Sequence, residues 1–450
     1  MKKKTLFLSF VLSLCTSSIP AHGQSREWTL KACIDYALEN NLDLHKARLA
    51  SESAATDVKE AKAALQPTLS ASMTQGVQYR PFQERTGSFV NGSIASSSSQ
   101  KVTQSGSYGI NMNWVVWNGG RNRDGITEAE YSEQQADLSI QQTANSIQEQ
   151  IASLYVQILY SKEAENVNRE LLENDKKLLA RGRELLAEGQ VARSDVAQLE
   201  AQVSSGEYEV VNAVTQIADY KLQLKQLLEL KGEEELEVSP IEIADKTIQI
   251  PVPSVSEVYQ TALTLRPEIK SGQIGMKQAA LAVKQAKAAR KPTISLTAGL
   301  GDSHMTGTQS NYFTQMKNNF DGSVGVSLSI PIFDNRSTKS AVERAEIDQL
   351  TSELELQDTQ KSLYSAIESY RLAAINYQQR YRASLSNVKS LEESYALMSE
   401  QFRIGSENIA ELLNSRSSLL EARQELLQNK YTALLNMALL NFYRGESLEL

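Results

Sequence analysis

Long segments of the first half of this 450-residue chain recur, in the same order, in its second half. The stretch ALENNLDL (37–44) matches ALTLRPEI (262–269), and AKAALQPTLSASM (61–73) matches AKAARKPTISLTA (286–298), each pair 225 positions apart. A duplicated unit of this size is far longer than a solenoid repeat. The chain is therefore expected to fold as two copies of one unit related by pseudo-symmetry.

The N-terminus has the features of a secretory signal peptide. Three lysines precede a short apolar stretch that ends at Leu14, and IPAHGQ follows, which predicts cleavage after Gly23. Leu14 is bulky where lipoprotein signals place a small residue, which argues against lipid attachment at Cys15. Removal of three lysines changes the net charge from −8 to −11, which disfavours nucleic acid as a partner. Cys33 is then the single cysteine of the mature chain, so no disulfide framework is expected within one chain.

Four segments alternate between apolar and polar residues, two in each half. In the first of them Leu69, Met73 and Val77 alternate with polar residues such as Ser70 and Thr74. This period of two predicts strands with one apolar and one polar face. Each strand is roughly ten residues long, the length that a tilted strand needs to cross a bilayer. A soluble sheet with one buried face is the alternative for any single strand.

Each strand pair is followed by a very long helical stretch and a second helix that returns. Apart from Gly125 at their start, residues 124–187 contain one glycine, Gly182, and no proline, and residues 337–404 contain neither glycine nor proline. The stretches end near Gly189 and Gly405, which occupy equivalent positions. At 1.5 Å per residue, each long helix would extend roughly 95–100 Å.

These patterns predict a signal peptide at 1–23, two repeats and an acidic inter-repeat linker. The expected boundaries are 24–230 for the first repeat, with strands at 68–80 and 106–118 and long helices at 124–187 and 194–230; 231–253 for the linker; and 254–450 for the second repeat, with strands at 293–302 and 321–333 and long helices at 337–404 and 409–443. The links between paired strands, 81–101 and 302–319, are expected to be exposed loops.

If the strands lie in a membrane, one chain cannot seal its own sheet. Unpaired backbone groups in hydrocarbon cost several kcal/mol each, so open sheet edges are not tolerated. Four strands are too few to close a barrel, since the smallest known have eight. Two chains would supply eight strands and three would supply twelve, and the physical argument leaves this choice open.

The order of these motifs resembles that of TolC-type outer-membrane factors over essentially the whole mature length. The strand-to-helix turns WVVWNGGR and IPIFDNR and the helix turns AEGQVARSDVAQLEAQ and FRIGSENIAELLNSR carry the resemblance. It implies a mainly α fold with membrane β, in which three chains pool four strands each into a twelve-stranded barrel continued by a helical periplasmic tunnel. It also implies a passive exit duct in the outer membrane of a Gram-negative bacterium. The implied partners are an adaptor protein, an inner-membrane pump of the RND or ABC type, and outer-membrane lipid.

The resemblance also implies a closed periplasmic end with acidic rings and inter-helix polar links. By position, the rings fall on Glu411 and Asn414, the link acceptors on Ser194 and Asp195, and their aromatic and basic partners on Phe402 and Glu407.

Several of these residues depart from the family pattern. Phe402 has no hydroxyl, and Glu407 would repel Asp195, so Arg403 or Arg193 are alternative partners. Asn414 is neutral, which leaves Glu411 and Glu407 as candidate acidic rings. The simpler interpretations are that Ser194 or Asp195 is a helix N-cap and that the glutamates only solvate the helix.

Catalysis has little support in the sequence. His45 and His304 have no evident partner cluster, and phosphate-loop and metal-ligand spacings are missing, so neither an enzyme nor a cofactor is expected. The competing class is a soluble periplasmic coiled-coil adaptor or chaperone-like protein. That class accounts for the helices but leaves the four alternating strands unexplained.

Overall fold

The computed structural model describes residues 27–82, 87–90, 93–96, 101–231, 235–240, 248, 250–308, 310–406 and 408–450. The predicted signal peptide, Cys15 and Glu407 lie outside the described residues. The helices are α1 (Leu30–Asn40), α2 (Leu42–Ala63), α3 (Arg121–Ala187), α4 (Arg193–Leu227), α6 (Val255–Leu265), α7 (Pro267–Ala288), α8 (Tyr312–Asn319), α9 (Ser337–Arg403) and α10 (Ile409–Tyr443). The strands are β1 (Glu27–Trp28), β2 (Thr68–Tyr79), β3 (Gly87–Val90), β4 (Ser93–Ser96), β5 (Val102–Trp117), β6 (Glu237–Val238), β7 (Thr293–Met305) and β8 (Asp321–Ser329).

The duplication is visible in helix lengths. α1 and α6 each have 11 residues, and α2 and α7 each have 22. α3 and α9 each have 67 residues, and α4 and α10 each have 35. The equal lengths arise because break signals recur at equivalent positions: Asn41 and Arg266 are N-caps between the paired short helices, and a glycine follows α3 and α9.

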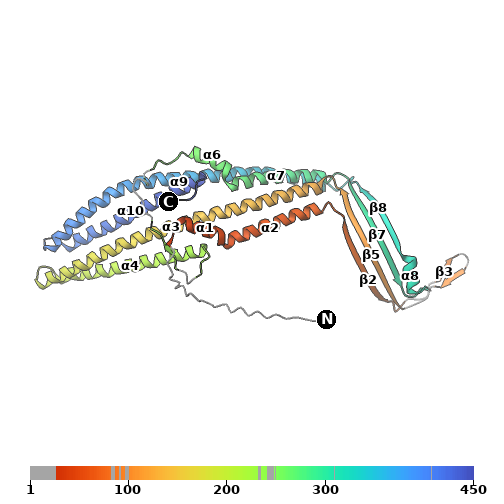
Figure 1. The fold of residues 1–450 in the computed structure, drawn as a ribbon, viewed down its shortest axis with the longest axis horizontal. Helices are drawn as coiled ribbons and strands as arrows, with labels where there is room; N and C mark the ends of the chain where they lie inside the picture. The colour runs from red at the N-terminus through yellow and green to blue at the C-terminus, as the bar shows by residue number, and fades with distance from the viewer. Residues whose placement is uncertain are drawn as a thin grey trace, which may run out of the picture.

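The molecule is elongated, with the sheet at one end and two helical hairpins at the other (Figure 1). α3 and α4 form the first hairpin, and α9 and α10 form the second. α2 and α7 run beside α3 and α9 on the side of the sheet, so every strand of the sheet continues into a helix (Figure 1). A helix of 67 residues spans about 100 Å, which sets the length of the helical part.

The sheet is antiparallel in the order β2-β5-β7-β8, so the two repeats meet where β5 pairs with β7. One face carries apolar side chains that remain open: Leu69 is 73% exposed and Val324 is 79% exposed. The other face carries polar residues such as Ser70 and Asn111. Exposed apolar patches of this kind mark surfaces that contact a membrane or another protein.

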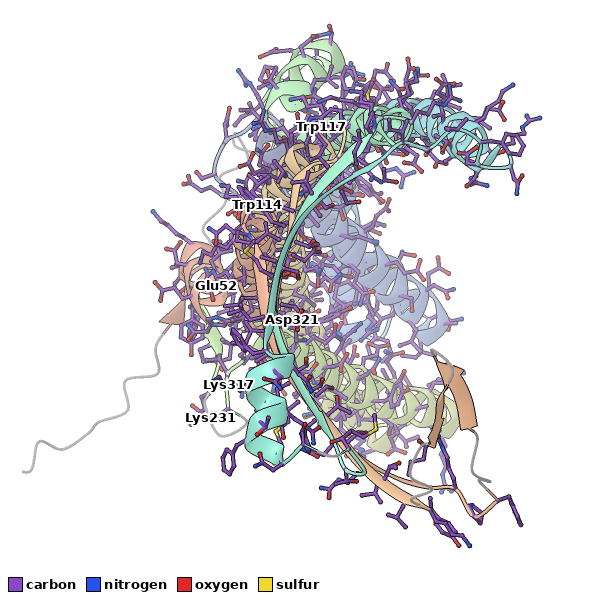
Figure 2. The ribbon with its side chains drawn as sticks, turned by 90° about the vertical axis from the view of Figure 1, so that its right-hand side faces the viewer. Glu52, Trp114, Trp117, Lys231, Lys317 and Asp321 are labelled. Atoms are coloured by element: carbon purple, nitrogen blue, oxygen red, sulfur yellow. The ribbon has the colours of Figure 1, made fainter. Side chains whose placement is uncertain are left out.

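Both edges of this sheet are open in a single chain. Among the described strands, β2 is hydrogen-bonded only to β5, and β8 only to β7. Aromatic residues lie near the strand ends, and Trp114 and Trp117 sit where the sheet meets the helices (Figure 2). The Trp114 indole N–H donates to the Leu65 carbonyl at 2.8 Å, which ties β5 to the end of the α2 segment.

The links between paired strands contain more structure than the sequence predicts. The segment 81–101 includes the hairpin of β3 and β4, and the segment 302–319 includes the end of β7 and the helix α8. The expectation that 302–319 is simply an exposed loop is therefore wrong. β8 ends at Ser329, short of the predicted end at 333, since Pro331 lacks the N–H that a strand ladder needs.

The inter-repeat segment is tied to the middle of the helical part. β6 pairs in parallel with β1, and Glu237 accepts from Lys221 Nζ at 2.6 Å and from Lys162 Nζ at 3.0 Å. Tyr155 on α3 lies beneath this pairing and donates to the Ser239 carbonyl at 3.0 Å. These contacts join the linker to both helices of the first hairpin.

Candidate pore constriction at the helix tips

The tip of the first hairpin is built around Gly189. Its φ of +72° is the left-handed conformation that glycine adopts without strain. The amide of Gln190 donates to the Leu185 carbonyl at 2.8 Å, which closes the end of α3. α4 then begins at Arg193.

The tip of the second hairpin repeats this geometry at Gly405, with φ of +76°. The amide of Ser406 donates to the Gln401 carbonyl at 3.0 Å, which closes α9 in the same way. Asn408 caps α10, and its side-chain oxygen accepts from the Ala410 amide at 2.9 Å. The two tips are therefore equivalent turns that differ in the side chains they carry.

Asp195 stabilises the start of α4. Its carboxylate accepts from the Ala192 amide at 3.0 Å, and Ser194 Oγ donates to the same carboxylate at 3.3 Å. The N-cap itself is Ala192, so the alternative that Ser194 or Asp195 occupies the N-cap position is wrong. Asp195 sits three residues after the N-cap, where a carboxylate can satisfy an orphan amide of the first turn.

Phe402 is an apolar element of the tip. It is 1% exposed and packs in a cluster with residues of α3, α4 and α10, among them Leu199 and Leu412. A Cβ at Gly182 would lie 2.6 Å from Leu199 Cδ1 and 4.0 Å from Phe402 Cζ. Glycine at this position therefore lets the Leu199 side chain of α4 pack directly against α3. Phe402 therefore stabilises the tip through apolar burial and dispersion contacts. A ring with a hydroxyl group could instead make a polar link.

Arg403 is engaged within its own helix. Its guanidinium donates to Glu400 at 2.6 Å and 2.8 Å, and this ion pair raises the pKa of Arg403 and lowers that of Glu400. The Arg403 carbonyl accepts from Arg181 Nε at 3.1 Å, which ties the end of α9 to α3. At this level Arg403 therefore contacts the first hairpin through its backbone carbonyl, beside the apolar packing of Phe402.

Glu411 and Asn414 lie exposed in the first turns of α10. They are three residues apart and share one face of the helix. Because Glu411 is in the first turn, its carboxylate is also favoured by the helix dipole. Glu407, the other candidate ring residue, lies outside the described residues.

Above the tips, the structure brings together a buried polar cluster that sequence reasoning missed. Arg416 Nη2 of α10 lies 3.1 Å from Asp175 Oδ2 of α3 and 3.8 Å from Glu209 Oε2 of α4. The amide of Gln202, with its oxygen toward the guanidinium, accepts from Arg416 Nε at 3.3 Å and Nη1 at 3.1 Å. Arg416 therefore connects the second hairpin to both helices of the first.

Burial controls the electrostatics of this cluster. The side chains of Asp175 and Arg416 are 1% and 3% exposed. Burial raises the pKa of Asp175, and the positive charge of Arg416 opposes that shift. The neighbouring Tyr395 of α9 has its pKa raised to about 12 by burial and by the negative charge of Asp175. All four long helices thus contribute a polar group to one desolvated site.

The sequence did contain a signal for this cluster. Arg416 interrupts the apolar stripe of Leu412 and Leu419, and Asp175 interrupts that of Leu171 and Leu178. A charge inside an apolar stripe needs a partner of opposite sign, because an unpaired buried charge is very costly. Two such interruptions in different hairpins are a pairing hypothesis that sequence alone could have raised.

Within the described part of the chain, no group of three or more His, Cys, Asp or Glu residues is arranged to hold a metal ion. None of the described helices combines the length and apolar character required to cross a membrane.

The duplicated hairpins and the open-edged sheet with its exposed apolar face define the class of helical ducts that end in a membrane-facing sheet. A family model of outer membrane efflux proteins matches residues 33–229 and 258–446. The chain belongs to the outer membrane efflux protein family.

Curated relatives include outer membrane protein TolC of Escherichia coli K12, 24% identical over 256 residues that cover 54% of this chain and 50% of that protein. The alkaline protease secretion protein AprF of Pseudomonas aeruginosa is 26% identical over 224 residues, 48% of this chain and 46% of that protein. The matched segments span about half the length of these relatives.

Solved structures share the fold over nearly the whole chain. CusC has a TM-score of 0.78 at 18% identity and covers 93% of this chain and 92% of its own. The outer membrane channel MtrE of Neisseria gonorrhoeae has a TM-score of 0.75 at 20% identity, over 93% and 89% of the two chains. The mainly α fold with a four-stranded sheet in each chain is therefore confirmed.

Proposed function

We propose that this chain is the outer-membrane exit duct of a tripartite efflux or type I secretion system. The observation that carries the proposal is the four-stranded sheet, which has one exposed apolar face and two edges that no described strand pairs with. Such a sheet fits lipid on its apolar face and further strands at its edges. Helices of about 100 Å then extend the wall away from the membrane.

The assembly in this proposal is a homotrimer with a twelve-stranded barrel. Eight strands, from two copies, would leave a lumen filled by side chains, whereas twelve leave space for an aqueous path. The polar face of each sheet, with Ser70 and Asn111, would line this path. Membership of the efflux family supports three copies.

The duct is passive in this proposal, and the energy comes from its partners. A periplasmic adaptor protein and an inner-membrane pump of the RND or ABC type would dock at the hairpin tips. The names of the relatives cover both uses, since TtgC is described as an efflux pump outer membrane protein and AprF as a secretion protein. The chain itself performs no catalysis in this proposal.

The constriction is proposed to lie at the hairpin tips, with Glu411 as an acidic ring and Asn414 beside it. Three carboxylates around a narrow opening would favour cations over anions. Ser194, Asp195 and Arg403 would act indirectly, because they fix the two turns from which α4 and α10 start. Phe402 and the cluster around Arg416 would hold the hairpins together.

The test is fractionation of cells that express the full chain, followed by purification in detergent. We expect the chain in outer membranes, a trimer band that disappears on boiling, and conductance steps in planar bilayers. A monomer that dissolves without detergent would instead identify the soluble coiled-coil alternative.

A further inference from the structure

At the upper end of β7, which is the end far from the helices, the described part of the chain places no strand on one side. β8 pairs with β7 only over Thr293–Gly301, so Asp302–Met305 extend past β8. On their other side these four residues pair with Ser105–Tyr108 of β5. One edge of the strand would therefore offer free backbone groups for further pairing.

α8 occupies this edge through side-chain bonds to the backbone. Gln315 Oε1 accepts from the Met305 amide at 2.8 Å, and Asn319 Nδ2 donates to the Ser303 carbonyl at 2.6 Å. The amide of the next residue, Thr306, points to the opposite side of the strand and donates to the Gln104 carbonyl of β5 at 2.7 Å. α8 thus satisfies the groups that a neighbouring strand would otherwise use.

Aromatic packing fixes α8 in this position. The Tyr312 ring meets the His304 ring edge-on, with centroids 4.8 Å apart, and His304 stacks on Tyr108 at 5.9 Å. His304 is 9% exposed, and a Cβ on Gly106 would collide with its ring. Asn311 caps the helix by accepting from the Thr314 amide at 2.8 Å.

The opposite face of α8 is open. Phe313 is 81% exposed, and Lys317, four residues later on the same face, is also exposed (Figure 2). The other free edge of the same sheet is β2, which has twelve residues, whereas β8 has nine. Suppose that β2 of one copy pairs with all nine residues of β8 in the next copy, starting at the end near the helices. Three residues of β2, Val77–Tyr79, then extend past β8 at the upper end.

We propose that α8 ends the seam between adjacent copies of this chain and receives the last residues of the neighbouring β2. This inference rests on the proposed trimeric assembly. The neighbour's β2 pairs with β8 for nine residues, and its Val77–Tyr79 segment then passes against Phe313. Because α8 has already occupied the upper edge of β7, the neighbour cannot slide up and pair there.

A fixed end matters because strand pairing is prone to slip by register. A shift of one residue would turn every apolar side chain of β2 toward the polar face. The exposed Val77 and Tyr79, at 72% and 65%, lie on the apolar face of the sheet, as does the ring of His304 that supports α8. In this proposal the helix α8 sets the upper end of the seam, beyond the last residue of β7 that pairs with β8.

Disulfide cross-linking in intact outer membranes tests this contact. In a Cys15→Ser, Cys33→Ala background, a chain that carries both Tyr79→Cys and Phe313→Cys is expected to give linked dimers and trimers on non-reducing gels. A chain with Leu69→Cys and Phe313→Cys, at the far end of the same strand, is the matched control and should give none.

Cross-links between β2 and β8 distinguish a failure of the proposed assembly from a failure of the proposed role of α8. Val326→Cys is combined in turn with Leu69→Cys, Ala71→Cys and Met73→Cys. If one of these pairs links while neither Val77→Cys nor Tyr79→Cys links to Phe313→Cys, the assembly stands and the role of α8 is overturned. If none links and the protein is a monomer, the proposed assembly itself has failed.

A second set of variants tests whether the edge bonds position α8. Replacing Gln315→Leu together with Asn319→Leu removes both bonds and is expected to lower the cross-linking yield between Tyr79→Cys and Phe313→Cys several-fold. Asn318→Leu, on the open face of the same helix, should leave the yield unchanged. An unchanged yield in the double variant would show that α8 does not depend on the β7 edge and would overturn the inference.

Discussion

The Arg416 guanidinium of α10 lies 3.1 Å from the Asp175 carboxylate of α3, and both side chains are shielded from water. This pair, together with Gln202 and Glu209, joins the two hairpins within an apolar cluster that includes Phe402. Its position makes the stability of the helical part sensitive to the loss of either charge.

Loss of one partner is expected to cost more than loss of both. Arg416→Met alone should lower the free energy of unfolding by about 3–5 kcal/mol, because the Asp175 carboxylate stays buried without a cation. Asp175→Leu alone should cost less than this, because Glu209 Oε2 still lies 3.8 Å from Arg416 Nη2. The double variant should lose much less. Urea unfolding of the purified protein, followed by helical circular dichroism, measures all three.

The exposed pair Arg183–Glu200 is the matched control for this cycle. Its atoms lie 2.8 Å apart but the side chains are 60% and 51% exposed. Arg183→Met should change the stability by about 1 kcal/mol or less. If Arg416→Met lowered the free energy of unfolding no more than Arg183→Met does, the role given to the Arg416 cluster would be contradicted.

Truncation of Phe402 should loosen the tip. Phe402→Ala removes a buried ring and is expected to destabilise the protein by about 3–5 kcal/mol. In the proposed channel it should also raise the conductance of the closed state in planar bilayers. Leu397→Ala, also on α9 but at a side chain 66% exposed, is the control that should change neither quantity.

Overfilling the same contact should also be unfavourable. Gly182→Ala places a methyl group 2.6 Å from Leu199 Cδ1, so a side chain must shift. The expected loss is about 1–3 kcal/mol, seen as a lower unfolding temperature. A stabilised Gly182→Ala variant would show that helix propensity outweighs the packing at this position.

Selectivity should follow the charge on the first turns of α10. A carboxylate 4–8 Å from an ion contributes about 0.5–1 kcal/mol in water, so Glu411→Gln should lower the cation-to-anion permeability ratio on the order of two- to five-fold. Asn414→Asp should change the ratio in the opposite direction. Reversal potentials under a salt gradient measure both, and an unaltered ratio in Glu411→Gln removes that residue from the constriction.

The link between Glu237 and the helices should weaken in acid. A hydrogen bond from Lys221, followed by one from Lys162, lowers the pKa of Glu237 despite partial burial. A carboxyl with a lowered pKa stabilises the folded state above its ordinary value of 4.5, and this contribution is lost as the pH falls through the lowered value. The effect is about 1 kcal/mol or less, because the side chain is 45% exposed.

Hydrogen exchange of residues 235–240 across pH 6 to 3 measures this change, after correction for intrinsic rates. Protection should fall below pH 4.5 in the native chain. Glu237→Gln should show weak protection at every pH. Protection in the native chain that does not depend on pH would mean that β1–β6 pairing alone holds the segment.

The fold was accessible from the sequence because its signals are local and occur twice. Gly189 and Gly405 end uninterrupted helical stretches, and their left-handed conformations are those that glycine tolerates best. The alternation around Leu69 and Val324 likewise follows from strand geometry alone, and both residues lie on the exposed apolar face.

The parts that sequence did not reveal depend on tertiary contacts. α8 has the sequence YFTQMKNN, a poor helix by propensity, and its position depends on the β7 edge and the His304 ring. The pairing of Arg416 with Asp175 joins residues 241 positions apart. The family resemblance assigns Phe402 to a polar link, whereas its neighbours place it in an apolar core.

The matched lengths of α3 and α9, and of α4 and α10, constrain how such a chain can evolve. An insertion of one heptad in a single hairpin would displace its tip by roughly 10 Å relative to the other. In a ring of alternating hairpins, the two kinds of tip would then lie at different levels along the axis. Every second tip would be too far from its neighbours to help close the end of the duct. Changes in duct length must therefore come as paired events, one in each half of the gene.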